Sequence, residues 1–198
     1  MRYARRHLPV YVVAMLLAGC VTGNVATTPS LGAAPDPARI SEWTAKGRIA
    51  VAAQGEGGSG SFVWQQHDDR TELAVRGPLG AGGLDLVTDG TTLQVADASG
   101  RTLDGDAARA LLEQRLGTSL PLQQLRYWML GLPAPTTAST PADPGSASPS
   151  GFTQAGWTVN LDESRTVDGW RVPARLSAAT STVRVRIIVD DWQLSAAP

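Results

Sequence analysis

Apolar and polar residues alternate with a period of two through much of this chain of 198 residues. The longest run lies near the C-terminus, where the residues at every second position are Val183, Val185, Ile187 and Val189. Successive side chains of a β-strand point to opposite faces, so this pattern indicates a strand with one face buried and the other in water. The chain therefore favours an antiparallel sheet whose inner face covers a core.

Three earlier segments show the same alternation. Their apolar members are Phe62, Trp64, Leu73, Val75, Leu93 and Val95. Turn-forming pairs stand between the expected strands, at Asp89-Gly90, Ser99-Gly100 and Asp168-Gly169. Such pairs favour tight connections because Gly accepts backbone conformations that other residues avoid. We expect several antiparallel strands joined by hairpins.

Two segments in the middle of the chain have a helical pattern instead. The first covers residues 106–116 and is followed by Gly117 as a stop signal. The second covers residues 121–130, with Pro121 in its first turn and Gly131 after its end. One side of this second helix is a broad apolar stripe that must cover something, and it contains Leu122, Leu125, Trp128 and Met129.

Together these elements predict a mainly β fold, a curved sheet or open barrel with two helices over its mouth. The folded domain is expected over residues 39–198. Residues 135–151, rich in Pro, Ser, Thr and Ala, are interpreted as a disordered surface loop inside that domain. Residues 20–38 have no periodicity and are interpreted as a flexible tether.

The N-terminus is typical of an export signal over residues 1–19. Arg2, Arg5 and Arg6 precede an apolar run over 8–18 that is too short to span a bilayer. The sequence Leu17-Ala18-Gly19-Cys20 resembles the lipobox of bacterial lipoproteins, which implies that Cys20 is lipidated and becomes the first residue of the mature protein. The alternative is an ordinary secreted protein with an unrelated cysteine after its signal.

Cys20 is the only cysteine in the chain, so no intramolecular disulfide and no thiolate metal cluster can form. A single acyl chain anchors a protein only marginally, and stable anchoring needs at least two. The lipobox resemblance implies a cysteine that carries two or three chains. Val21 follows the cysteine, where an Asp would signal retention in the inner membrane. We therefore expect the protein in the outer membrane, facing the periplasm.

Composition describes a globular protein, with 42% hydrophobic and 18% charged residues. The net charge of -1 argues against a nucleic-acid partner, because such proteins normally carry a basic excess. Tryptophan is unusually frequent, with six residues against three tyrosines and two phenylalanines. These large aromatic side chains either line a binding site or simply fill a bulky core.

Catalytic residue patterns are weak. His67 stands beside Asp68 at an expected hairpin turn, and neither Ser59 nor Ser61 forms the Gly-x-Ser-x-Gly elbow of a nucleophilic serine. We interpret His67 as a solvated turn residue.

The acidic pairs Asp162-Glu163 and Asp190-Asp191 are adjacent on expected strands. Such neighbours should point to opposite faces and cannot jointly flank one bond. Neither pair has a histidine at metal-ligand spacing.

A Gly-x-Gly-x-x-Gly match at Gly55, Gly57 and Gly60 leads into a strand, whereas a dinucleotide-binding site would need it to open a helix. We interpret it as a loose hairpin loop. The sequence predicts no enzyme, no metal site and no cofactor.

A tight turn over Gly77-Pro78-Leu79-Gly80 presents an apolar residue at its tip. Leaving a leucine in water forgoes about 1.5–3 kcal/mol of burial free energy. Leu79 either folds back over the rim of the barrel or meets an apolar partner such as a membrane.

Several blocks of the chain, in order from about residue 43 to 194, resemble the outer-membrane lipoprotein receptor family LolB. The specific ones are the Pro78-Leu79-Gly80 turn and the block Trp128-Met129-Leu130-Gly131-Leu132-Pro133. Weaker ones are residues 62–66, 84–86, 120–122, 173–176 and 190–192. The chain departs from well-studied members at Gly77, where they carry Asn, and in its longer segment after Pro135.

This resemblance implies an unclosed antiparallel β-barrel with helices that lid a hydrophobic cavity. It implies a monomeric receptor that takes lipoproteins from the periplasmic carrier LolA and places them in the outer membrane, with the turn at Pro78, Leu79 and Gly80 acting in membrane insertion. The candidates for the acyl-chain cavity are Trp64, Leu73, Val75, Leu125, Trp128, Met129 and Trp192. Each of them is also compatible with plain core.

Two alternatives stay open. A lipid-anchored, lipocalin-type module would hold a small apolar ligand without delivering it. A structural lipoprotein would dock onto an envelope complex and would need a filled core, not a hollow one.

Overall fold

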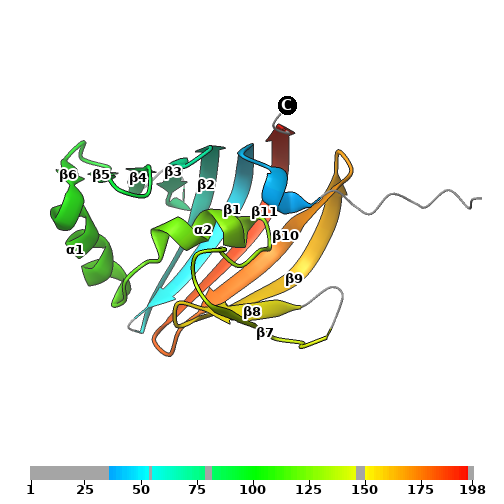
Figure 1. Ribbon diagram of the computed structural model, residues 1–198. Helices are drawn as coiled ribbons and strands as arrows, with labels where there is room; N and C mark the ends of the chain where they lie inside the picture. Colours follow the sequence, from blue (N-terminus) through cyan, green and yellow to red (C-terminus); the bar gives the residue numbers. More distant parts are fainter. Residues whose placement is uncertain (1–35, 54, 79–81, 146–149, 196–198) are drawn as a thin grey trace, which may run out of the picture. The chain divides into compact units, whose positions relative to one another are not determined.

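The computed structural model describes residues 36–53, 55–78, 82–145 and 150–195. In this part of the chain eleven strands form one sheet in the order β6-β5-β4-β3-β2-β1-β11-β10-β9-β8-β7 (Figure 1). The first six strands are β1 (Glu42–Ala53), β2 (Glu56–His67), β3 (Arg70–Arg76), β4 (Gly83–Thr88), β5 (Leu93–Asp97) and β6 (Thr102–Asp104). The others are β7 (Ser139–Pro141), β8 (Gly151–Gln154), β9 (Trp157–Val167), β10 (Trp170–Ala179) and β11 (Val183–Ser195).

The sheet consists of two antiparallel meanders joined along one seam. Neighbours in sequence pair as hairpins on each side, and β1 pairs with β11 to join the two halves. The short strands β6 and β7 end the order, and within the described residues they do not pair with each other. The sheet is therefore open, and the predicted mainly β, unclosed antiparallel fold is confirmed.

Two α-helices follow β6 and lie on one face of the sheet (Figure 1). Helix α1 (Gly105–Leu116) packs against β5 and β6 through Ala108 and Leu112. Helix α2 (Leu122–Met129) lies over the central strands, and a short 3-10 turn, η1 (Pro37–Arg39), precedes β1. The predicted helices begin and end within two residues of these bounds. Neither helix is long and apolar enough to cross a membrane.

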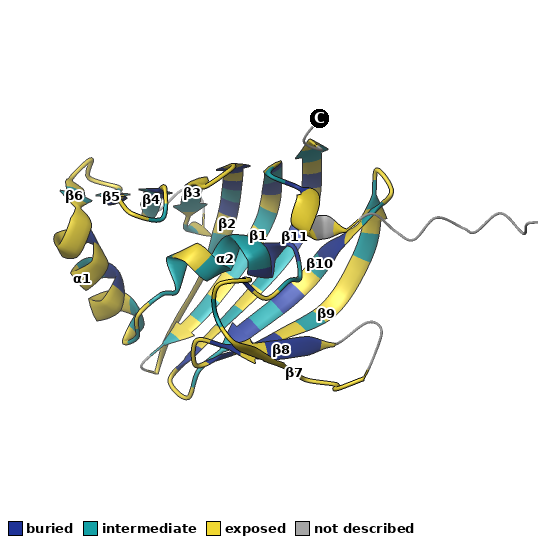
Figure 2. Cartoon of the chain, in the orientation of Figure 1, coloured by how far each residue is buried: buried dark blue, intermediate teal, exposed yellow. Residues whose placement is uncertain are grey.

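Burial alternates along the central strands as the sequence pattern predicts (Figure 2). In β11, Val183 and Val189 are buried, whereas Arg184 and Arg186 are exposed. The alternation is interrupted once by a β-bulge, because Lys46 of β1 lies opposite Asp191 while its neighbour Gly47 lies opposite Val189. The extra residue, Asp190, leaves both aspartates exposed and returns Trp192 to the inner face.

The prediction that Asp190 and Asp191 point to opposite faces was therefore wrong, because the bulge breaks the alternation on which it rested. Gly47 fits the same bulge, since a Cβ at this position would lie 2.0 Å from the carbonyl oxygen of Ile188. Both aspartates face away from the core, and Asp190 pairs with Arg48 at 3.1 Å.

The glycine-rich segment before Phe62 is a strand and not the predicted loose loop. Residues 57–60 belong to β2 and pair in register with residues 49–52 of β1. A Cβ at Gly60 would lie 2.1 Å from the carbonyl oxygen of Arg76, so the backbone of the neighbouring strand β3 comes close here. The sequence pattern missed this strand because its inner positions carry no side chains.

The Pro- and Ser-rich segment over residues 135–151 is partly ordered. Within it β7 pairs with β8, with Ser139 opposite Gln154, and Gly151 begins β8. Residues 146–149 lie outside the described part of the chain. The expected disordered loop thus contains an edge strand, which low-complexity composition hides.

Candidate functional site: an apolar cavity beneath the helices

A cavity of about 370 Å³ lies between the inner face of the sheet and the two helices. Six of the seven side chains predicted for such a cavity line it, and these are Trp64, Leu73, Val75, Leu125, Trp128 and Met129. The other lining residues are Ile49, Val51, Gly58, Ser59, Gly60, Leu84, Leu86, Leu112, Arg115, Leu116, Leu120, Trp157, Leu176, Ala178, Val185 and Ile187. Ser59 and Arg115 are the polar members of this set, so the wall is almost entirely apolar.

Strands β2, β3 and β4 supply one wall through side chains in cross-strand register. Trp64 lies opposite Leu73, and Leu73 lies opposite Leu86 of the next strand. The indole of Trp64 donates a hydrogen bond to Oε1 of Gln66 at 3.1 Å, and Thr71 donates to the same oxygen at 2.7 Å. Because its only polar atom is satisfied inside the protein, Trp64 presents apolar ring surface to the cavity.

Helix α2 supplies the roof through Leu125, Trp128 and Met129, which lie on the side facing the sheet. The indole of Trp128 donates to Oε1 of Gln154 at 2.9 Å. Gln154 is buried and also joins the segment after the helix, because it accepts from the amide of Ala134 at 2.8 Å and donates to the carbonyls of Ala134 and Thr137. Sequence reasoning missed Gln154, since a single glutamine on the short strand β8 carries no distinguishing pattern.

The outer side of α2 is fixed to two strand turns. Arg126 donates to the carbonyl of Asp68 at 2.8 Å and forms an ion pair with Asp69. Gln123 donates to the carbonyl of Gly90 at 2.6 Å in the turn between β4 and β5. The roof is therefore held by polar contacts at its rim, while its apolar stripe faces the cavity.

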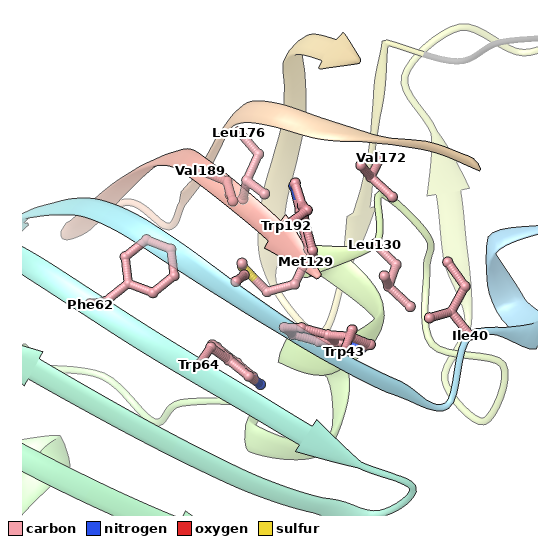
Figure 3. Close-up of a cluster of buried hydrophobic side chains, with 11 residues drawn as sticks. Ile40, Trp43, Phe62, Trp64, Met129, Leu130, Val172, Leu176, Val189 and Trp192 are labelled. Carbon is pink, nitrogen blue, oxygen red and sulfur yellow. The ribbon is translucent and has the colours of Figure 1, made fainter. Parts of the chain in front are cut away.

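The seventh predicted residue, Trp192, lies in the neighbouring core and not in the cavity wall. It packs edge-on against Trp43, with ring centroids 5.2 Å apart, and its indole donates to the carbonyl of Pro173 at 2.9 Å. Figure 3 shows Trp43, Trp64 and Trp192 gathered with Met129. Trp192 lies after the bulge at Asp190, near the C-terminal end of β11, where core side chains fill the space.

Trp157 lines the cavity instead, although it was not among the candidates. It begins β9 and lies 6.2 Å from Trp128 between ring centroids. The alternation of Trp157, Val159 and Leu161 was the available signal for an inward face. The tryptophans therefore divide between the two interpretations, since some line the cavity and others fill the core.

Residues 58–60 of β2 and the last turn of α1 both line the cavity. A Cβ added at Gly58 would meet no atom within 4 Å, so this position faces open space. Arg115 and Leu116 of α1 line the same cavity. Because the strand lacks large side chains here, the part of the cavity next to Gly58 stays unfilled.

Two predicted sites extend beyond the described residues. Pro78 is exposed two residues after the end of β3, whereas Leu79 and Gly80 lie outside the described part of the chain. Cys20 and the expected tether up to residue 35 also lie outside it.

The described residues contain no group of three or more His, Cys, Asp or Glu side chains placed to hold a metal ion. His67 is exposed at the end of β2. The open sheet and the apolar cavity beneath its helices form a geometry suited to apolar ligands.

Comparison with known proteins identifies the family of this chain. Residues 41–192 match the family described as outer membrane lipoprotein LolB. The outer-membrane lipoprotein LolB of Pseudomonas putida is 32% identical over 200 residues, which cover 95% of this chain and 96% of that protein. Its counterpart from a Marinomonas species is 29% identical over 193 residues, covering 96% and 98%. The chain belongs to the outer membrane lipoprotein LolB family.

Family membership makes the protein an outer-membrane lipoprotein with a role in lipoprotein localisation, and not an enzyme. A crystal structure of a DUF1329 family protein from Desulfovibrio piger has the same fold, with a TM-score of 0.53 at 7% identity. The similarity covers 82% of this chain and 89% of that one, and it concerns the fold alone.

Proposed function

We propose that this protein is a receptor that accepts lipoproteins from a periplasmic carrier of the LolA type and inserts them into the inner leaflet of the outer membrane. The observation that supports this proposal is the cavity of about 370 Å³ with its almost wholly apolar wall. An acyl chain leaves water for such a wall with a gain of about 0.8 kcal/mol per buried methylene. The cargo is held by its lipid and not by its protein sequence.

Transfer from carrier to receptor then depends on relative affinity. Each tenfold difference in affinity corresponds to about 1.4 kcal/mol, which a few additional apolar contacts provide. The indole surfaces of Trp64, Trp128 and Trp157 are good candidates for these contacts, because they line the cavity and their rings bury large areas. Delivery to a bilayer remains downhill, since a membrane buries whole acyl chains.

The remaining parts of the proposal rest on the sequence and on the family. Lipidated Cys20 anchors the receptor in the outer membrane, and the turn at Pro78, Leu79 and Gly80 acts in passing cargo to the bilayer. The partners are the carrier and its lipidated cargo, and the receptor works as a monomer.

The test mixes the protein with a lipoprotein-loaded carrier and asks which protein holds the lipoprotein afterwards. Gly58→Leu should reduce acceptance strongly, because the new side chain enters the cavity without meeting any atom within 4 Å of its Cβ. Gly57→Leu is the matched control, since Gly57 is the neighbouring strand residue and is not part of the cavity wall. A melting curve of each variant shows whether it is folded.

No transfer to the wild-type protein would contradict the proposal. Binding of small apolar ligands without transfer from the carrier would favour the lipocalin-type alternative. Equal loss of transfer in the Gly57 and Gly58 variants would show that the cavity is not where the acyl chains bind.

A further inference from the structure

Of the described residues that line the cavity, Arg115 alone carries a charge. It lies in the last turn of α1 and is exposed. In the described part of the chain its side chain takes part in no ion pair and no hydrogen bond, whereas six other arginines are paired with carboxylates. Its guanidinium group is therefore available to a ligand at the edge of an apolar cavity.

We propose that the cavity also binds single-chain amphiphiles with an anionic head group, whose head is held by Arg115. This inference rests on the proposed acyl-chain cavity, because the alkyl chain occupies the same space. It adds a second class of ligand that the receptor function does not require. The N-acylated diacylglyceryl cysteine of a lipoprotein ends in amide, ester and thioether groups, so that cargo offers no anionic group for the guanidinium to bind.

The size of the cavity supports a single chain. The volume of about 370 Å³ lies within the range of roughly 300–1,000 Å³ that is typical of small-ligand pockets. It therefore accommodates an alkyl chain whose head group stays at the edge.

The strand wall of the same cavity leaves room for such a head group. Gly58 faces open space, and Ser59 is an exposed polar residue that also lines the cavity. A carboxylate or phosphate at this edge can stay hydrated while it pairs with the guanidinium group, so its charge need not be buried.

The helix itself opposes an anion here, which makes the role of Arg115 testable. The C-terminal end of a helix carries about half a unit of negative charge from its free carbonyl groups. Without the arginine, the last turn of α1 should repel an anionic head group. Replacing Arg115 should therefore abolish or reverse a preference for anions, and not merely weaken all binding.

The experiment displaces a neutral fluorescent acyl probe from the mature chain carrying Cys20→Ala, so that the protein is made without its own lipid. The competitors are palmitate, lysophosphatidylglycerol with a palmitoyl chain, and neutral monopalmitoylglycerol. Palmitate should displace the probe at about fivefold lower concentration than the neutral competitor, as expected for a solvent-accessible ion pair. Equal displacement by lysophosphatidylglycerol would identify lysophospholipids as a second source, and weak displacement by it would restrict the site to fatty acids.

Arg115→Met should remove this preference, and Arg115→Lys should retain most of it. Arg109→Met is the matched control, because Arg109 is an exposed arginine on the same helix outside the cavity wall. Equal affinity of wild type for palmitate and monopalmitoylglycerol would overturn the inference but leave the receptor function intact. An unchanged preference in folded Arg115→Met would do the same, and no binding of the probe by wild type would contradict both.

Discussion

At the scale of single residues, Gln154 shows how a buried amide positions an apolar roof. Both of its polar atoms are used, because Oε1 accepts from Trp128 and from the amide of Ala134 while Nε2 donates to two carbonyls. One side chain thus connects α2, the segment that follows it and strand β8. These bonds, together with the helix, hold Trp128 over the cavity.

Gln154→Leu should destabilise the fold by about 3 kcal/mol, because it leaves the buried Trp128 indole and the Ala134 amide without their acceptor. The free energy of unfolding in urea measures the effect. Gln65→Leu serves as the control, since Gln65 is an exposed glutamine on β2 and its replacement should change the stability by less than about 0.5 kcal/mol. A Gln154 variant as stable as the control would show that water or a rearranged side chain takes over these bonds.

Leu79 carries a prediction from sequence, since it lies outside the described residues. A leucine in a Pro-Gly turn gains little by facing water, and Pro78 beside it is exposed. Leu79→Glu should leave the melting temperature and acceptance from the carrier unchanged. It should slow delivery to membranes, because a carboxylate must lose water to enter the bilayer interface.

The measurement for Leu79 is a reconstituted assay with carrier, receptor and liposomes, run beside a melting curve. Leu79→Ile is the control and should deliver normally. Normal delivery by folded Leu79→Glu would refute the role in release, and a large fall in melting temperature would place Leu79 in the core.

At the scale of elements, the turn between β4 and β5 connects a strand hairpin to the roof helix. The Asp89 carboxylate accepts from the amide of Thr92 at 2.7 Å and from the amide and hydroxyl of Thr91. These hydrogen bonds hold the pKa of Asp89 well below its usual range. In the same turn, the carbonyl of Gly90 accepts a hydrogen bond from Gln123 of α2.

Asp89→Ala should therefore lower the stability at neutral pH. Because the pKa of Asp89 is lower in the folded chain than in the unfolded one, its stabilising effect is fully present above the unfolded value, about 4. The effect is lost as the pH falls from there towards the folded value. Urea unfolding of wild type and variant across this range should show a stability difference that shrinks on acidification, and a difference that stays constant or grows would contradict the assignment.

The elements that the sequence could predict are those whose local pattern agrees with their burial. The alternation of valines in β11 and the apolar stripe on α2 are of this kind, because each element has one face in the core and the other in water. The glycine-rich part of β2 was missed because a strand without side chains has no pattern. The bulge at Asp190 was missed because it depends on the partner strand.

The same reasoning explains which site residues could be predicted. Six of the predicted cavity residues lie on strand or helix faces that show a clear apolar period in the sequence, and all six line the cavity. Trp192 also lies on an inward face, but neighbouring side chains such as Trp43 fill the space around it, and this packing is not visible in the sequence. Composition cannot separate a tryptophan that lines a cavity from one that fills a core.

At the scale of the whole molecule, the binding body and the expected anchor are separate parts of the chain. Every described residue that lines the cavity lies between Ile49 and Ile187, and the family match covers residues 41–192. Cys20 precedes this range by more than twenty residues in the sequence. Binding and anchoring should therefore be separable by a change at Cys20 alone.

Cys20→Ala should release the protein from the outer membrane, because a chain without its acyl groups has neither of the two lipid signals that stable anchoring needs. Cell fractionation measures this, with the wild-type chain as the control. The unlipidated body should still accept lipoproteins from a loaded carrier in solution, because its cavity is intact. An outer-membrane location that survives the change would refute Cys20 as the anchor. Loss of acceptance by a folded Cys20→Ala protein would instead show that the lipid takes part in binding, so that anchor and cavity act together.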